Sequence, residues 1–173
     1  MQIGLVAIAA AAVLSTNAHA EEATPPSDHW YARIEDGRWC SYATEKDWNA
    51  NPAHEAASAS FLNGQLRHVT TDTSDESGDW IEYDDYTVEN GLLTSLKRTY
   101  NTFYNGEISL RETYTLRDGQ WRRLTRNIYA LGGDDPRPDQ PDVKPPDKPV
   151  NQLSAFGFYA VLNIKPAAKP ICK

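Results

Sequence analysis

The stretch that decides the fold is residues 80–128, WIEYDDYTVENGLLTSLKRTYNTFYNGEISLRETYTLRDGQWRRLTRNI. Three turn dipeptides divide it: Asn90-Gly91, Asn105-Gly106 and Asp118-Gly119. The segments between them are rich in aromatic and β-branched residues. Asn-Gly and Asp-Gly between such segments are the strongest short-range signals of a β-hairpin. The stretch therefore predicts four consecutive antiparallel strands.

The same turn signals extend this pattern toward the N-terminus. Asp36-Gly37 and Asn63-Gly64 precede the three turns above, and each full repeat has the length of two strands and two turns. We expect strands at residues 30–35, 38–45, 55–62, 65–72, 79–89, 92–104, 107–117 and 120–131. The sequence thus predicts an all-β protein, an antiparallel up-and-down meander of about 8–9 strands that closes into a barrel or a strongly curved sheet. Residues 53–60 are rich in alanine and fit either a strand or a short helix.

The ends of the chain differ from this central part. Residues 1–20 contain no Lys, Arg, Asp or Glu and end in Ala18-His19-Ala20, which is typical of a cleaved signal peptide. We therefore expect a periplasmic or secreted protein with no membrane span after cleavage. Residues 21–28 are expected to be a disordered N-terminal segment and residues 29–132 the β-meander domain. Residues 133–150 hold six prolines and predict a loop. Residues 151–173 are expected to add a terminal strand, within 153–164, and a tethered tail.

Cys40 and Cys172 are the two cysteines of the chain. An exported protein with an even number of cysteines most simply joins them, because disulfides persist in oxidising compartments. We expect this bond to hold the tail beside the second strand.

Alternation of side chains identifies the interior face of the meander. Even-numbered positions from 80 to 128 hold most of the large apolar residues, whereas odd positions hold mainly Thr, Ser, Asn and charged residues. A three-residue loop keeps even positions opposite even positions. We therefore expect the loops to be Glu89-Asn90-Gly91, Tyr104-Asn105-Gly106 and Arg117-Asp118-Gly119.

This register places charged groups on the interior face. Glu82 is expected opposite Arg98, Arg98 opposite Glu112, and Glu112 opposite Leu124. One neighbouring row would hold Trp80, Tyr100, Leu110 and Arg126, and the other Asp84, Leu96, Tyr114 and Arg122. Buried charges must pair or face water. Two interpretations stay open, a structural ladder of charges and a ligand site. The candidate ligand-binding residues are Trp80, Glu82, Arg98, Tyr100, Glu112, Tyr114 and Arg126.

Catalytic and cofactor signals are weak. The sequence has no GxSxG, HExxH or phosphate loop and no metal-ligand spacing of Cys and His, so no catalytic residue, metal or cofactor is predicted. Glu82 and Glu112 could suggest a glycosidase pair, but Arg98 between them would keep both ionised and leave no general acid.

The distribution of charge favours a binding function. Eight acidic residues and no basic residue lie between positions 72 and 89, whereas most of the charged residues in 92–131 are basic. The acidic run has no EF-hand spacing, so we interpret it as a solvated acidic edge. Export and a pI near 5.0 argue against a nucleic-acid partner. We expect a monomeric, non-catalytic binding protein, such as a periplasmic inhibitor or immunity-type protein that acts through a protein partner. The alternative is a barrel carrier of a small amphipathic or anionic ligand, and the third choice is a small hydrolase.

One short motif carries a resemblance to a known family. Gly37-Arg38-Trp39 near the start of the barrel, together with a terminal cysteine bridged to an early strand, resembles the lipocalins. The resemblance implies a β-barrel that carries a small ligand. It covers three residues and one disulfide.

Overall fold

The computed structural model describes residues 27–51, 53–103, 106–138, 143–145, 148–163 and 169–173. The expected signal peptide, residues 1–20, lies outside the described residues, as do residues 21–26. No helix in the described part of the chain is long and apolar enough to cross a membrane.

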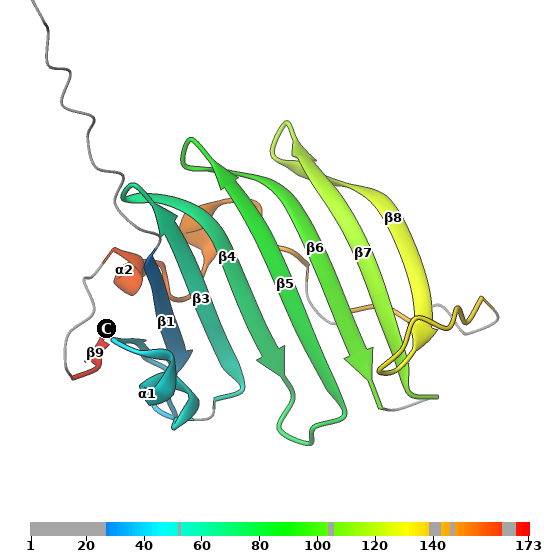
Figure 1. Cartoon of the computed structure of the whole chain (residues 1–173), viewed down its shortest axis with the longest axis horizontal. Coiled ribbons are helices and arrows are strands. Elements are labelled where there is room, and N and C mark those ends of the chain that lie inside the picture. Colours follow the sequence, from blue (N-terminus) through cyan, green and yellow to red (C-terminus); the bar gives the residue numbers. More distant parts are fainter. Residues whose placement is uncertain (1–26, 52, 104–105, 139–142, 146–147, 164–168) are drawn as a thin grey trace, which may run out of the picture.

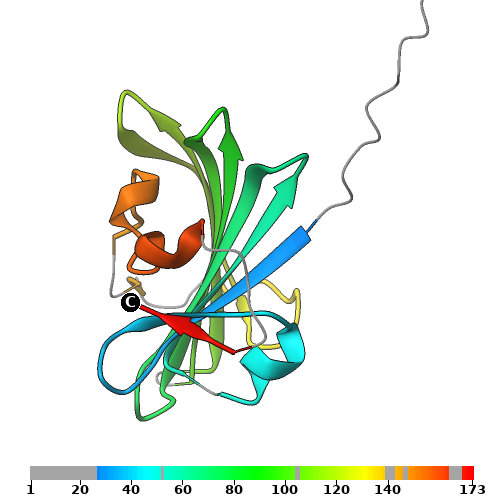
Figure 2. The same cartoon turned by 90° about the vertical axis from the view of Figure 1, so that its left-hand side faces the viewer.

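One antiparallel sheet of nine strands forms the body of the protein (Figure 1). Its strands are β1 (Ser27–Arg33), β2 (Trp39–Tyr42), β3 (Glu55–Leu62), β4 (Gln65–Ser74), β5 (Trp80–Glu89), β6 (Leu92–Thr102), β7 (Ile108–Arg117), β8 (Gln120–Ala130) and β9 (Ile171–Cys172). The all-β prediction is confirmed. The alanine-rich stretch 53–60, for which both a strand and a short helix were predicted, contributes residues 55–60 to strand β3. The sheet is strongly curved and does not close (Figure 2), because β8 and β9 are its two terminal strands.

The strand order corrects the predicted simple meander. The order is β8-β7-β6-β5-β4-β3-β1-β2-β9, so β3 pairs with β1 and not with β2. The short helix α1 (Glu45–Asn49) connects β2 to β3, so the predicted strand to residue 45 is too long. Thr44 caps this helix by accepting a hydrogen bond from the backbone N–H of Asp47 at 3.1 Å. The indole N–H of Trp48 donates to the carbonyl of Tyr31 in β1 at 2.9 Å, which holds α1 across that strand.

The C-terminal segment fills the concave face of the sheet. The expected terminal strand within 153–164 is wrong: this stretch forms the 3₁₀ helix η1 (Leu153–Ala155) and the short helix α2 (Tyr159–Leu162). Both lie inside the curve of the sheet (Figure 2). The buried rings of Phe156 and Phe158 stack on each other, with centroids 5.1 Å apart. Phe158 also stacks on Tyr31 of β1, so the C-terminal segment forms part of the hydrophobic core on the concave face.

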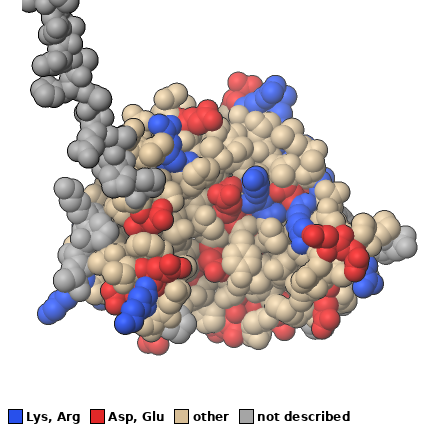
Figure 3. All heavy atoms as spheres, viewed as in Figure 1, with Lys and Arg blue, Asp and Glu red and all other residues tan. Residues whose placement is uncertain are grey.

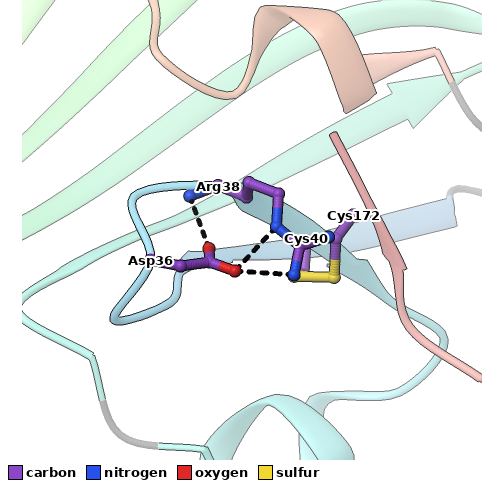
Figure 4. Close-up of a disulfide and its surroundings, with 4 residues drawn as sticks. All are labelled: Asp36, Arg38, Cys40 and Cys172. Atoms are coloured by element: carbon purple, nitrogen blue, oxygen red, sulfur yellow. Dashed lines mark hydrogen bonds and ion pairs between the residues drawn. A yellow bond between two sulfur atoms is a disulfide. The ribbon is translucent and has the colours of Figure 1, made fainter.

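The expected disulfide is confirmed. Cys40 in β2 is bonded to Cys172 in β9, and the two residues are direct cross-strand partners (Figure 4). The backbones of Trp39 and Lys173 bond to each other in both directions beside it. The tail is therefore tied to the edge of the sheet next to the loop that holds the Asp36–Arg38 ion pair.

A close approach at Gly157 yields a stability prediction. A Cβ atom at this position would lie 2.5 Å from Nε1 of Trp39 and 3.1 Å from Cε2. Gly157→Ala should therefore push the indole or the segment 156–158 out of place and lower the free energy of unfolding by roughly 1–3 kcal/mol. Chemical denaturation monitored by tryptophan fluorescence measures this.

Gly133→Ala is the matched control, because the nearest atom to its added Cβ would be 3.9 Å away. If both alanine variants unfold at the same denaturant concentration as the wild type, the contact between Gly157 and Trp39 is not tight in solution.

Candidate functional site

The register of the hairpins places the candidate residues. The predicted three-residue loops at 89–91 and 117–119 are wrong, because β5 and β6 are joined by Asn90-Gly91 and β7 and β8 by Asp118-Gly119. All four of these turn residues have positive φ, between 52° and 77°, as a type I′ turn requires. Of the third predicted loop, 104–106, residues 104 and 105 lie outside the described residues.

A one-residue bulge restores the pairing of even with even positions. Thr87 pairs with Ser95 while Val88 pairs with Leu93, so Thr94 is the extra residue on β6. On β8 the extra residue is Leu124, and on β4 it is Arg67. Beyond each bulge the even-numbered positions of neighbouring strands face the same side of the sheet, as predicted. The observed register of the β5–β6 and β7–β8 pairs nevertheless differs from the predicted register by two residues.

The observed row of charges alternates in sign across four strands. Asp84 pairs with Arg98, Arg98 with Glu112, and Glu112 with Arg126. The predicted pairing of Arg98 with Glu112 is confirmed. The predicted pairs Glu82–Arg98 and Glu112–Leu124 are wrong as register partners, since Glu82 pairs with Tyr100 and Leu124 is the bulged residue.

Arg98 holds two carboxylates at the centre of the concave face. Its Nε and Nη2 donate to the two oxygens of Asp84 at 2.7 and 2.6 Å, and Nη2 lies 3.0 Å from Oε1 of Glu82. The hydroxyl of Tyr86 donates to Asp84 at 2.8 Å. Arg98 is 3% exposed, and both acids are buried too. Burial opposes the charge of Arg98, but the hydrogen bonds and charge of Asp84 overcome it and raise the pKa of the guanidinium. These buried acids do not belong to the expected solvated edge.

Glu112 is the centre of the second half of the row. Its Oε1 accepts from Arg126 at 2.8 Å and from Arg123 at 3.0 Å, and its Oε2 accepts from the hydroxyl of Tyr114 at 2.5 Å. Arg126 also donates to the carbonyl of Val143, which links the sheet to the proline-rich segment. Burial and the bond to Glu112 raise the pKa of Tyr114 to about 12.

The environment of Glu112 predicts a pH dependence of stability. Burial raises its pKa, but the hydrogen bonds from Tyr114, Arg126 and Arg123 outweigh burial, so the pKa lies below its usual 4.5 in the folded protein. The native state therefore binds fewer protons than the unfolded state. This contribution to stability is present above about pH 4.5 and is lost as the pH falls through the lower, folded pKa.

The measurement is urea unfolding of the wild type and Glu112→Gln between pH 7 and pH 3. The stability difference between the two proteins should shrink as the pH falls. Glu89→Gln, at an exposed carboxyl at the end of β5, is the control and should give a small difference. A constant difference for Glu112→Gln at every pH would contradict the assignment.

A small cavity lies beside Arg98. It measures about 150 Å³, and its lining includes the charged residues Glu82, Asp84 and Arg98 and several aromatic residues. The aromatic residues are Trp39, Tyr86, Phe156 and Phe158. Of the seven candidate ligand-binding residues, two, Glu82 and Arg98, line it. Trp80 and Tyr100 contact each other further along the same face, with ring centroids 5.8 Å apart.

Sequence reasoning missed several members of this site. It placed Asp84 one row away from Arg98, and it left out Arg123 because that position has odd parity. The C-terminal phenylalanines were expected in a strand and not inside the curve. The ligand-binding role of the seven candidates stays a prediction, and their contacts with each other fit the structural ladder.

Comparisons of the chain with models of protein families, with curated proteins and with solved structures gave no significant match.

Proposed function

We propose that this protein is an exported, non-catalytic binding protein that acts through a protein partner, as an inhibitor or immunity-type protein of the periplasm does. The observation that carries the proposal is the occupation of the concave face by the chain's own residues 153–162. A carrier uses this face for its ligand. Here Phe156, Phe158, Val161 and Leu162 are buried in it.

The size of the cavity beside the charged row supports the same choice. Ligand pockets for small molecules typically measure roughly 300–1,000 Å³, whereas the cavity beside Arg98 measures about 150 Å³. Arg98, Glu82 and Asp84, which line it, are also paired with one another. Export is supported by the expected signal peptide and by the disulfide, a bond that persists in oxidising compartments.

The convex face offers a surface suited to a protein partner. Acidic and basic side chains lie close together on it, with uncharged residues between them (Figure 3). Tyr83 is 38% exposed there. The convex row beside the charged interior row includes Asp85 and Lys97, which pair in register. Charges arranged in this way give specificity and fast association with a complementary protein surface.

The test combines native mass spectrometry with site-specific photo-crosslinking of the protein expressed in its source organism. A photoreactive amino acid replaces one exposed residue at a time: Tyr83, Leu92 or Leu124. We expect the isolated protein to have the mass of the disulfide-bonded chain alone, and we expect at least one of the positions to cross-link to a single polypeptide. The others serve as controls for random collision.

A stoichiometric small molecule retained in the native mass spectrum would overturn the proposal in favour of the carrier alternative. Equal labelling of many polypeptides from all three positions, or none from any of them, would also overturn it.

A further inference from the structure

Exposed arginines lie at the outer edge of the sheet, on β8 and at the end of β7. β8 is a terminal strand, so one side of its backbone has no neighbouring long strand. Arg122 and Arg123 are exposed on consecutive positions and therefore point to opposite faces of the sheet, and Arg117 lies at the adjoining end of β7. Within the described residues, Arg122 and Arg117 make no ion pair. Leu124, the bulged residue that follows Arg123, is 66% exposed.

The chain itself shows that this edge accepts an extended segment, residues 135–137. In the second half of β8, the backbone N–H of Ala130 donates to the carbonyl of Asp135 at 2.9 Å, and the N–H of Arg137 donates to the carbonyl of Ile128 at 2.9 Å. Tyr129 and Pro136 form an antiparallel bridge there. This added segment follows Asp134, which pairs with Arg111 of β7 at 2.5 Å.

The first half of the edge has no paired strand among the described residues, although Val150 and Asn151 bond to Trp121 and Gly119 at this end of β8. None of the described residues forms a backbone hydrogen bond with the outer side of β8 over residues 120–125. An exposed edge of this kind is a template for another strand. Pairing of two copies through this edge is disfavoured, because it would bring their arginines together.

Resting on the proposed function, we infer that the β8 edge over residues 120–125 is the docking site for an extended acidic segment of the protein partner. The segment would add a strand antiparallel or parallel to β8. Its carboxylates would pair with Arg122 and Arg117, and an apolar side chain would cover Leu124. Main-chain hydrogen bonds would supply affinity and the arginines would select for acidic sequences.

The probe is a capped seven-residue peptide of alternating glutamate and valine, labelled with a fluorophore and titrated at low salt with the full-length mature protein. We expect saturable binding that Arg122→Glu weakens by about tenfold. Lys46→Glu is the matched control: it makes the same change in charge at an exposed position of α1, which contacts β1 and β2 at the other end of the sheet from β8, and it should bind the peptide as the wild type does.

A second peptide tests strand addition. In this peptide alternate backbone nitrogens are methylated, which keeps the charge of the peptide and removes the N–H groups that would donate hydrogen bonds to β8. The methylated peptide should therefore lose most of the binding. Circular dichroism of each variant checks that it is folded. The inference is overturned if neither peptide binds, if the methylated peptide binds as well as the parent, or if Lys46→Glu weakens binding as much as Arg122→Glu.

Failure here is distinguishable from failure of the proposed function. If the photoreactive residue at Tyr83 or Leu92 captures a single polypeptide while the one at Leu124 does not, the protein binds a partner elsewhere and the edge is not the docking site. If no position captures one, the proposed function itself fails.

Discussion

Arg98→Leu should lower the free energy of unfolding by roughly 3–5 kcal/mol, and the melting temperature by roughly 10 °C for a domain of this size. The substitution removes the guanidinium that serves Asp84 and Glu82 and leaves both carboxylates buried. An isolated buried carboxylate is far more costly than the pair it came from. Urea and thermal unfolding, followed by circular dichroism, measure the loss.

Two further variants show whether Arg98→Leu loses stability because buried carboxylates are left unpaired. Arg38→Leu breaks the Arg38–Asp36 pair, whose side chains are 56% and 51% exposed, and it should cost less than about 1 kcal/mol. Adding Asp84→Asn to Arg98→Leu should recover part of the stability, because one buried charge is removed. A folded Arg98→Leu protein with wild-type stability would show that the cluster is hydrated in solution and would favour the ligand-site interpretation.

Removal of the disulfide should have an effect of similar size. Cys40 and Cys172 are 132 positions apart in sequence, so the bond restricts almost the whole unfolded domain. The double variant Cys40→Ser, Cys172→Ser should lose roughly 4–5 kcal/mol, which corresponds to a urea midpoint lower by roughly 2 M. Since β9 is two residues long, the tail should also detach from β2.

Reduced wild-type protein is the control, because it keeps the same side chains without the bond. It should unfold at nearly the same urea concentration as the double variant. Both should also bind a fluorescent dye for apolar surfaces more strongly than the oxidised wild type, as the segment over the concave face loosens. Identical unfolding of oxidised and reduced protein would mean that the packing of Phe156 and Phe158 alone holds the tail.

Much of the fold follows from local signals in the sequence. The Asn-Gly and Asp-Gly pairs end and begin strands, so the bounds of β3 to β8 agree closely with the expected ranges. The alternation of apolar side chains correctly identifies the interior face of β5 and most of β6 and β7. These signals are local, and each depends on a few neighbouring residues.

The predictions that were wrong concern features that depend on contacts between distant residues. No residue type marks Thr94 or Leu124 as a bulge, so the register of the charged row could not be derived from alternation alone. Helix α1, where a strand to residue 45 was expected, lies across β1 because Trp48 reaches the carbonyl of Tyr31. The run 153–164 is apolar enough for a strand, and only its docking inside the curve favours helical turns.

The bulges on β4, β6 and β8 constrain how this chain can change in length. Loss of one such residue, without any other change, would invert the parity of the rest of its strand and turn buried arginines or carboxylates toward solvent. One added residue in the turn could offset that loss, because a three-residue connection gives the same parity without a bulge. Insertions and deletions in these hairpins should therefore survive in compensating pairs, and related chains should differ there by matched changes within a single hairpin.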